Sequence, residues 1–288
     1  MKVLVTGAGG QVGQALLATA PRDLALVLCA HTDLDITDQR AVSAQMRQQA
    51  PQVVINTAAY TAVDRAESEP DIARKANCLG PRLLAAAARD IGARLIHLST
   101  DFVFDGHSSV PYPPEAPTHP LSVYGETKRA GEQAVLDLPG LDALVLRTSW
   151  VYAAQGRNFL NTMLRLMKAN GTVRVVSDQV GTPTSAGSLA QMIWQLVRLP
   201  RLSGIHHWTD AGVASWYDFA VAIAEEAAAI GLLSAQVEVL PIATEQYPTP
   251  ARRPSYSVLD KSSLSTLEVP LVHWRANLRR VLREIRDA

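Results

Sequence analysis

Cysteine is scarce in this chain, and neither sign of charge is in excess. The 2 cysteines, Cys29 and Cys78, stand far apart, and no CxxC or HExxH pattern occurs. Neither a disulfide framework nor a zinc site is therefore indicated, and no metal site is expected. Lys and Arg number 27 against 27 Asp and Glu, so the formal net charge is +0. No overall field is available to attract nucleic acid or an acidic membrane.

A long apolar run is missing as well. The longest uncharged stretch, Gln179 to Val197, is interrupted by glycine, proline, serine and glutamine, so it lacks the pattern of a membrane span. Met1 leads directly into the apolar run Lys2–Thr6, which argues against a secretory signal. We expect a cytoplasmic protein with no membrane partner and no nucleic-acid partner.

The composition is that of a globular protein. Of 288 residues, 48% are hydrophobic and 19% are charged, far from the polar, unbalanced composition of disordered chains. At roughly 150 residues per domain, the length predicts one large domain or two closely packed ones. A chain of this size buries about three-quarters of its unfolded surface, so its core does not depend on disulfides or metals.

Short apolar runs alternate with amphipathic stretches through the first half of the chain. This rhythm is typical of βαβ units around a parallel sheet. We therefore predict a Rossmann-type, doubly wound α/β fold. Its strands are expected at Lys2–Thr6, Ala25–Ala30, Val53–Asn56, Arg94–Ser99 and Ala143–Arg147, and its helices at Gln11–Ala20, Gln39–Gln48, Pro70–Ile91 and Val123–Leu136.

The pattern changes after Trp150. Residues 1–150 are predicted to form the doubly wound domain, and residues 151–288 a smaller α/β lobe interwoven with it. In this lobe the run His206-His207-Trp208 is expected in a β segment with structural imidazoles, and Pro241–Pro254 in a loop. Helices are expected at Phe159–Ala169, Ser188–Val197, Trp216–Ile230 and Ala276–Ile285, and a strand at Val173–Val176.

A glycine-rich turn joins the first strand to the first helix. The segment Gly7-Ala8-Gly9-Gly10-Gln11-Val12-Gly13 follows the strand directly. Gly7 permits a tight turn, Gly9 or Gly10 lets the backbone approach a pyrophosphate, and Gly13 lets the helix pack closely on the strand. The free N–H groups of the new helix then point toward the phosphates. Residues 1–150 are therefore expected to bind NAD(P), although glycines also end strands for structural reasons alone.

The end of the second strand bears on the choice of nicotinamide cofactor. NAD-preferring folds place a carboxylate there for the ribose 2′-hydroxyl, whereas this strand ends near Cys29. His31 and Thr32 suit a 2′-phosphate, which favours NADPH and leaves NADH open. Asp35 and Ile36 are expected to contact the adenine, with the alternative that Asp35 caps the following helix.

Tyr124 and Lys128 lie four residues apart on a predicted helix, so they share one face. The ammonium is expected to lower the pKa of the phenol from its usual value near 10 and to hold the nicotinamide ribose. Tyr124 then acts as an acid or base near neutral pH. Thr100 and Asp101 follow the fourth strand and lie at its carboxyl end, where open α/β sheets bind ligands.

Four segments together give the chain a family resemblance: Thr6–Gly13, Asn56–Ala59, Ser99–Asp101 and Tyr124–Lys128. They resemble the extended short-chain dehydrogenase/reductase family. Within it the chain is similar to the dTDP-4-dehydrorhamnose reductases over essentially its whole length. The more specific segments are Tyr60–Glu69, Ser99–Phe104, Arg147–Tyr152 and Tyr247–Pro254.

The resemblance implies an NAD(P)H-dependent oxidoreductase that reduces the C4 keto group of dTDP-4-dehydro-6-deoxy-L-mannose to dTDP-L-rhamnose. Hydride adds to C4, Tyr124 donates the proton to O4, Thr100 supplies a hydrogen bond and Lys128 tunes Tyr124. The resemblance further implies a sugar site lined by Asp101, Trp150 and Thr61, and cofactor contacts from Gly10, Gln11, Val12, Ala59, Tyr60 and Thr61. Trp150 has the alternative of being a core aromatic residue.

Arg252 and Arg253 stand before Pro254 in the proline-rich segment. A planar guanidinium suits a diphosphate, so Arg253 is a candidate for binding the nucleotide part of the substrate. A surface ion pair is the equal alternative.

The chain departs from the family pattern in a possible metal site. Some of these reductases bridge a dimer through metal-bound glutamates, one on the first helix and one on the helix after the Thr-Pro-Thr turn. Those places correspond to Ala15 and Ser188. A hard cation has too few ligands there, so we expect no structural Mg²⁺ and a monomer or weak homodimer.

Four alternatives are weighed against this assignment. Sugar-nucleotide 4,6-dehydratases follow Thr-Asp with a Glu base, but this chain has Phe102, which cannot remove a proton. A 4-epimerase or another nucleotide-sugar 4-reductase stays open, because either uses the same Tyr and Lys. A non-catalytic dinucleotide-binding regulatory subunit is the alternative of another class, although Thr100, Tyr124 and Lys128 favour an enzyme.

Overall fold

A parallel sheet forms the centre of the computed structural model, which describes residues 1–199, 202–234, 237–267 and 269–288. Its strand order is β2-β1-β3-β4-β5-β10, and every neighbouring pair is parallel. The order reverses direction between β1 and β3, which is where doubly wound sheets bind ligands. The strands are β1 (Lys2–Thr6), β2 (Ala25–Cys29), β3 (Val53–Asn56), β4 (Arg94–Thr100), β5 (Ala143–Thr148) and β10 (Gly204–His207).

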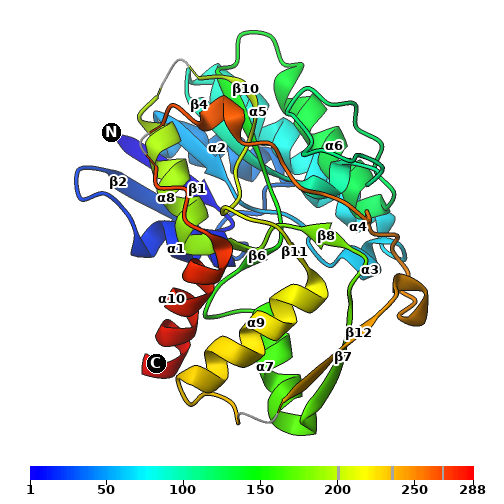
Figure 1. Cartoon of the computed structure of the whole chain (residues 1–288). Helices are drawn as coiled ribbons and strands as arrows, with labels where there is room; N and C mark the ends of the chain where they lie inside the picture. The colour runs from blue at the N-terminus through cyan, green and yellow to red at the C-terminus, as the bar shows by residue number, and fades with distance from the viewer. Residues whose placement is uncertain (200–201, 235–236, 268) are drawn as a thin grey trace.

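Helices cover both faces of this sheet because successive strand side chains alternate between the faces. Val3 and Val5 pack on one face against α1 (Gln11–Ala18) and α8 (Ala186–Val197). Leu4 packs on the other face of the sheet. A second group of helices covers that face, behind the sheet in Figure 1. These are α2 (Gln39–Gln49), α5 (Gly80–Asp90) and α6 (Val123–Leu136); α3 (Val63–Ala66), α4 (Pro70–Arg74) and the π-helical turn η1 (Lys75–Leu79) precede α5.

A smaller lobe has a second core, built around Phe219 with Tyr152, Phe159 and Trp274 against it. Figure 1 shows α7, α9 and the paired strands β7 and β12 together at one end of the molecule. The elements are α7 (Phe159–Asn170), α9 (Trp216–Ala229), α10 (Trp274–Asp287), β7 (Thr172–Val176) and β12 (Glu238–Ile242), with the short strands β6 (Val151–Tyr152), β8 (Val180–Gly181), β9 (Thr184–Ser185) and β11 (Ala214–Ser215).

The predicted fold class is confirmed, and two local predictions are wrong. The His206-His207 segment is not part of the smaller lobe: it lies in β10, which pairs with β5 and completes the central sheet. Pro241 lies in the edge strand β12 rather than in a loop, a position that tolerates a missing N–H. The division at residue 150 stays a prediction.

Within the described residues, no helix has the length and apolar character to cross a membrane.

Candidate functional site

The glycine turn abuts the loop that follows β3. Gly7 has φ +70, and a Cβ atom on it would lie 2.5 Å from the backbone nitrogen of Ala58. A Cβ on Gly13 would lie 2.5 Å from the carbonyl oxygen of Gly7. The roles predicted for these two glycines are therefore seen in the geometry. The first turn of α1 carries no acidic residue, and its N-cap Gly10 offers no side chain to the helix N–H groups, which leaves them free for an anion.

The loop after β2 is held by its own carboxylates. Asp33 accepts a hydrogen bond from Ala30 N at 2.8 Å, and Asp35 accepts from Thr37 N at 2.9 Å. Asp35 therefore does not cap α2, because Asp38 performs that function. Ile36 is buried, 5% exposed. The adenine contacts of Asp35 and Ile36 stay predictions.

A buried asparagine that the sequence pattern did not mark ties the Ala59–Thr61 loop to the catalytic helix. Asn77, in the π-helical turn η1, accepts from Tyr60 N at 2.8 Å and donates to the Tyr60 carbonyl at 3.0 Å. Its amide also donates to Thr127 Oγ1 on α6 at 3.1 Å. Asn77 has no exposed surface, and π turns recur at functional sites. The predicted cofactor loop and the helix that carries Lys128 are thus fixed to one another.

Close packing brings α6 to the end of β4. A Cβ on Gly125 would overlap the carbonyl of Phe102, so a side chain there would push the helix away. Ser122 caps the helix by accepting from Gly125 N at 3.2 Å. The Tyr124 ring then packs edge-on to Phe102, with 5.5 Å between ring centroids. The hydroxyl of Thr100 donates to Asp101 Oδ1 at 3.1 Å and lies close enough to the Tyr124 phenol to lower its pKa, so the two predicted catalytic residues are neighbours.

The electrostatics of Tyr124 differ from the prediction. Burial raises its pKa to about 12, and the negative field of Asp101 adds to the rise. Lys128 Nζ donates instead to the Leu98 carbonyl at 2.7 Å, and burial lowers the pKa of Lys128 to about 8. The expectation that Lys128 lowers the Tyr124 pKa is therefore wrong for this arrangement, because burial governs the Tyr124 pKa and the Lys128 ammonium is bound to the Leu98 carbonyl. A phenol with a raised pKa carries its proton at neutral pH, as a proton donor must.

Asp101 is almost fully buried beside these groups. It is 1% exposed, and its Oδ1 accepts from the Thr100 hydroxyl at 3.1 Å. Ser257, another residue that no sequence motif singled out, lies near enough to lower the pKa of the Asp101 carboxyl. Oδ2 has no partner among the described residues. Burial raises the pKa of Asp101 to about 6.

We predict that Asp101→Asn changes how stability depends on pH. The ordinary pKa is 3.8 and the folded one about 6, so between these values the folded protein binds more protons than the unfolded chain. The free energy of unfolding therefore falls as pH rises through this window, by on the order of 2 kcal/mol. Asp101→Asn should remove this fall, measured by urea unfolding at pH 4 and pH 7. Parallel curves for the two proteins would contradict the raised pKa.

Trp150 has a left-handed backbone, with φ 47. Its ring stacks on Trp216 at 3.5 Å between centroids, and it packs so closely on Gly181 that a Cβ there would lie 2.7 Å from Trp150 Cε2. Trp150 is only partly buried against the core of the smaller lobe. Such strain in a residue other than glycine is found where function holds the backbone in place, and the sugar contact of Trp150 stays a prediction.

Arg253 makes the ion pair that was the alternative to a diphosphate contact. Its Nη2 and Nη1 donate to Asp64 at 2.8 and 3.0 Å, and Nη1 also reaches Thr249 Oγ1 at 2.6 Å. Asp64 lies on α3, so this pair joins the sheet domain to the segment near residue 250. Its diphosphate contact stays a prediction.

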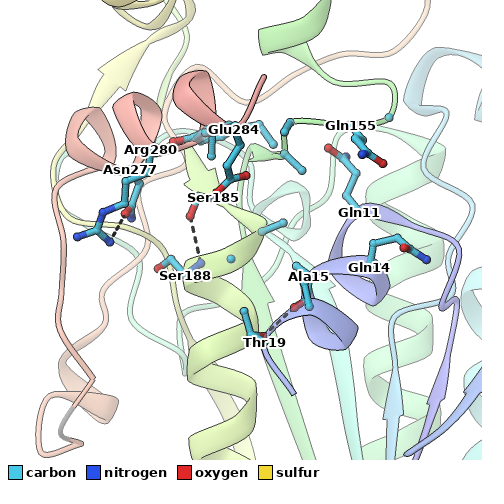
Figure 2. A pocket seen from close by; sticks show the side chains of 18 of the residues that line it. Gln11, Gln14, Ala15, Thr19, Gln155, Ser185, Ser188, Asn277, Arg280 and Glu284 are labelled. Atoms are coloured by element: carbon cyan, nitrogen blue, oxygen red, sulfur yellow. Dashed lines mark hydrogen bonds between the residues drawn. The ribbon is translucent and has the colours of Figure 1, made fainter. Parts of the chain in front are cut away.

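The two positions expected to lack metal-binding glutamates line one cavity of about 690 Å³. Figure 2 shows Ala15 on α1, Ser188 on α8 and Glu284 on α10 around this cavity, while the Arg280 guanidinium lies at its margin beside Asn277. Across residues 1–199, 202–234, 237–267 and 269–288, no cluster of three potential metal-ligating side chains is found. None of the predicted catalytic residues lines this cavity.

Apart from Arg253, the predicted site residues lie at the ends of β1 to β5 or in the segments that follow them, and these carboxyl ends meet at one edge of a parallel sheet. Three features together define the class of protein: a glycine turn at a free helix N-terminus, the neighbouring Thr100 and Tyr124, and a buried lysine. That class is the oxidoreductases of the short-chain dehydrogenase/reductase type.

The comparisons with known proteins narrow the class to one family. The model of the RmlD substrate binding domain family matches residues 1–287, so the chain belongs to that family. It is 38% identical to dTDP-4-dehydrorhamnose reductase of Salmonella typhimurium, over 99% of this chain and 98% of the relative. It is 43% identical to a probable dTDP-4,6-dihydroxy-2-methyloxan-3-one 4-ketoreductase of Streptomyces antibioticus, over 99% of this chain and 96% of the relative.

A solved structure agrees with this placement. The dTDP-4-dehydrorhamnose reductase of Bacillus anthracis in complex with NADP matches with a TM-score of 0.92 and 35% identity, over 98% of this chain and 99% of that one. The predicted family, fold class and enzyme class are confirmed.

Proposed function

We propose that this protein reduces the C4 keto group of dTDP-4-dehydro-6-deoxy-L-mannose (dTDP-4-dehydrorhamnose) to dTDP-L-rhamnose with NADPH or NADH. The observation that carries the proposal is the buried Thr100–Tyr124–Lys128 group. Its helix is tied through Asn77 to the Ala58–Tyr60 loop, which abuts a glycine turn that suits a dinucleotide pyrophosphate. Relatives of 38% and 43% identity carry the names of 4-keto reductases, and a relative's structure contains NADP.

The residues of the site fit the cofactor and the reaction. A bound nicotinamide supplies the hydride. The N–H groups at the start of α1 bind the pyrophosphate, and Lys128 has donors beyond the one used by Leu98 to hold a ribose. The protonated Tyr124 donates its proton to O4 of the sugar, and the Thr100 hydroxyl lies beside the phenol. Phe102, beside the ring, offers no base for dehydration.

The sugar itself is the open part of the proposal, since the Streptomyces relative is named for a different 4-keto sugar. The test follows the loss of nicotinamide absorbance at the same enzyme concentration, once with NADPH and once with NADH. Each is supplied with dTDP-4-dehydrorhamnose made in situ by the upstream dehydratase and epimerase. We expect oxidation, faster with NADPH. Calorimetric NADPH binding without oxidation would move the function to another keto sugar or to a regulatory subunit.

Arg253→Ala should raise the KM for the nucleotide sugar much more than the KM for the nicotinamide, because a guanidinium at the substrate segment binds a diphosphate. Asp64→Asn frees the same guanidinium from its ion pair, so it should leave the sugar KM equal or lower. Arg252→Ala, one residue away and exposed, is the matched control. Equal effects of Arg253→Ala on both KM values would show that the residue is structural.

Oligomeric state, location and metal content complete the proposal. We propose a monomer or weak homodimer acting in the cytoplasm, with no structural metal at the cavity of Ala15 and Ser188. Sedimentation velocity with and without Mg²⁺ tests the first and the last of these.

A further inference from the structure

A buried ion pair lies under the site and has no part in the chemistry described so far. Arg147 forms a bidentate salt bridge with Glu132: its Nε donates to Oε1 at 2.8 Å and its Nη2 to Oε2 at 2.7 Å. Both residues are 2% exposed. The pair joins β5, which carries Arg147, to α6, which carries Glu132. Because such a pair often adds little net stability over apolar residues of similar size, its presence needs another reason.

The surroundings of Arg147 fix it in place. Its Nη1 donates to the Pro114 carbonyl at 3.1 Å, and its guanidinium lies 5.1 Å from the centroid of the Phe104 ring. His207 lies beside it, with 3.4 Å between His207 Nε2 and Nη1. Burial and the Arg147 charge lower the pKa of His207 to about 3, so this ring is neutral. Arg147 therefore holds the Glu132 carboxylate in one position.

Glu132 stands one helical turn after Lys128, on the same buried face of α6. Lys128 is 3% exposed, and a buried ammonium loses its charge unless an anion opposes the desolvation. The charges of His97 from β4 and Glu132 from α6 act on Lys128 or are acted on by it. Tyr124 precedes Lys128 by one turn of the same helix, and Arg147 from β5 binds Glu132. Burial keeps His97 neutral and Tyr124 protonated. From η1, the neighbour Asn77 is uncharged.

We propose that Glu132, clamped by Arg147, is a positioning residue that keeps Lys128 cationic in the reductase site. The proposal rests on the proposed function only for the use of that cation, to hold the nicotinamide ribose. The field of Glu132 raises the pKa of Lys128 against the lowering by burial, in agreement with the geometry.

The direct test is the Lys128 titration in the protein without substrate. Lysines labelled with ¹³C at Cε are followed by NMR from pH 6 to 11, and Lys128→Arg assigns the signal. Glu132→Gln should lower the pKa of Lys128 by about 1 or more. The matched control is Glu126→Gln, which removes the same charge from an exposed position on the same helix and should leave the signal unmoved.

A double variant controls for the unpaired Arg147 charge that Glu132→Gln leaves in the interior, and for the loss of folding that this charge could cause. Glu132→Gln alone leaves Arg147 buried without its partner, so Glu132→Gln combined with Arg147→Met removes both charges. Circular dichroism checks that each variant is folded. In the double variant the pKa of Lys128 should lie between those of Glu132→Gln and the wild type. A wild-type value there would show that the unpaired Arg147, not the loss of Glu132, moved it, and would overturn the proposal.

A kinetic readout separates positioning from a merely structural role. In Glu132→Gln the alkaline limb of the kcat profile should move to lower pH together with the NMR titration. At a fixed pH on that limb, activity should fall about tenfold when the Lys128 pKa falls by about 1. An unmoved titration and an unmoved profile in the folded variant would overturn the proposal. Because the NMR titration needs no turnover, a wrong substrate assignment would leave its outcome readable.

Discussion

Tyr124→Phe should reduce kcat by about a thousandfold while leaving NADPH binding unchanged. The variant removes one oxygen, the atom proposed to donate the proton, and general acid catalysis of this kind contributes roughly 10²–10⁴ to a rate. The ring keeps its edge-on contact with Phe102, so the site retains its shape. Nicotinamide absorbance gives kcat, and calorimetry gives the dissociation constant of NADPH.

Tyr112→Phe is the matched control for this experiment. Tyr112 is also buried, and its hydroxyl donates to Asp105 at 2.8 Å, so the variant loses the same atom away from the proposed proton transfer. It should keep its turnover. If Tyr124→Phe turned over at the wild-type rate, another group or water would be the proton donor. If neither the wild type nor the variant turned over while both bound NADPH, the result would support the alternative of a non-catalytic regulatory subunit.

The elements of the sheet domain were predictable because their signals are local. Val3 to Val5 alternate between two apolar layers, and the glycine turn follows at once, so β1 and α1 begin where expected. The same holds for α6, which spans Val123–Leu136 as predicted. Family resemblance rests on equally local segments, which is why the enzyme class could be inferred before any contact was known.

What the sequence did not reveal depends on contacts between distant residues. The ion pair of Arg253 joins it to Asp64, 189 positions away, and β10 pairs with β5 far along the chain, as in the pairing of Gly204 with Leu144. Burial is equally invisible along the chain. Spacing placed Lys128 beside Tyr124, but only the packing shows that desolvation governs both of their pKa values.

Buried polar residues with no motif were missed for a related reason. Asn77 lies in a segment that reads as an ordinary helix, so nothing marks the π turn that aims its amide at Tyr60. Arg147 was placed in a strand and Glu132 on a helix, but nothing in the sequence shows that the two form a buried pair. A polar residue on the apolar face of a predicted helix is the one signal that was available, and Glu132 shows it.

Gly13→Ala should weaken NADPH binding by about tenfold or more and lower the free energy of unfolding. A Cβ there would lie 2.5 Å from Gly7 O and 2.6 Å from Ala8 Cα. These are backbone atoms of the cofactor turn, so they cannot swing aside, and the turn must move relative to α1. Overpacking of this kind costs roughly 1–3 kcal/mol. Urea unfolding and calorimetry with NADPH measure the two effects.

Gly187→Ala separates this clash from the general effect of replacing a helical glycine. Gly187 lies in the first turn of α8 and has no atom within 4 Å of an added Cβ, and alanine favours a helix over glycine by about 1 kcal/mol. The control should therefore be as stable as the wild type or more so. Because that same preference acts at position 13, any loss seen there understates the clash. If Gly13→Ala gained stability and bound NADPH normally, the contact with Gly7 would not constrain the turn, and the pyrophosphate assignment would lose its geometric basis.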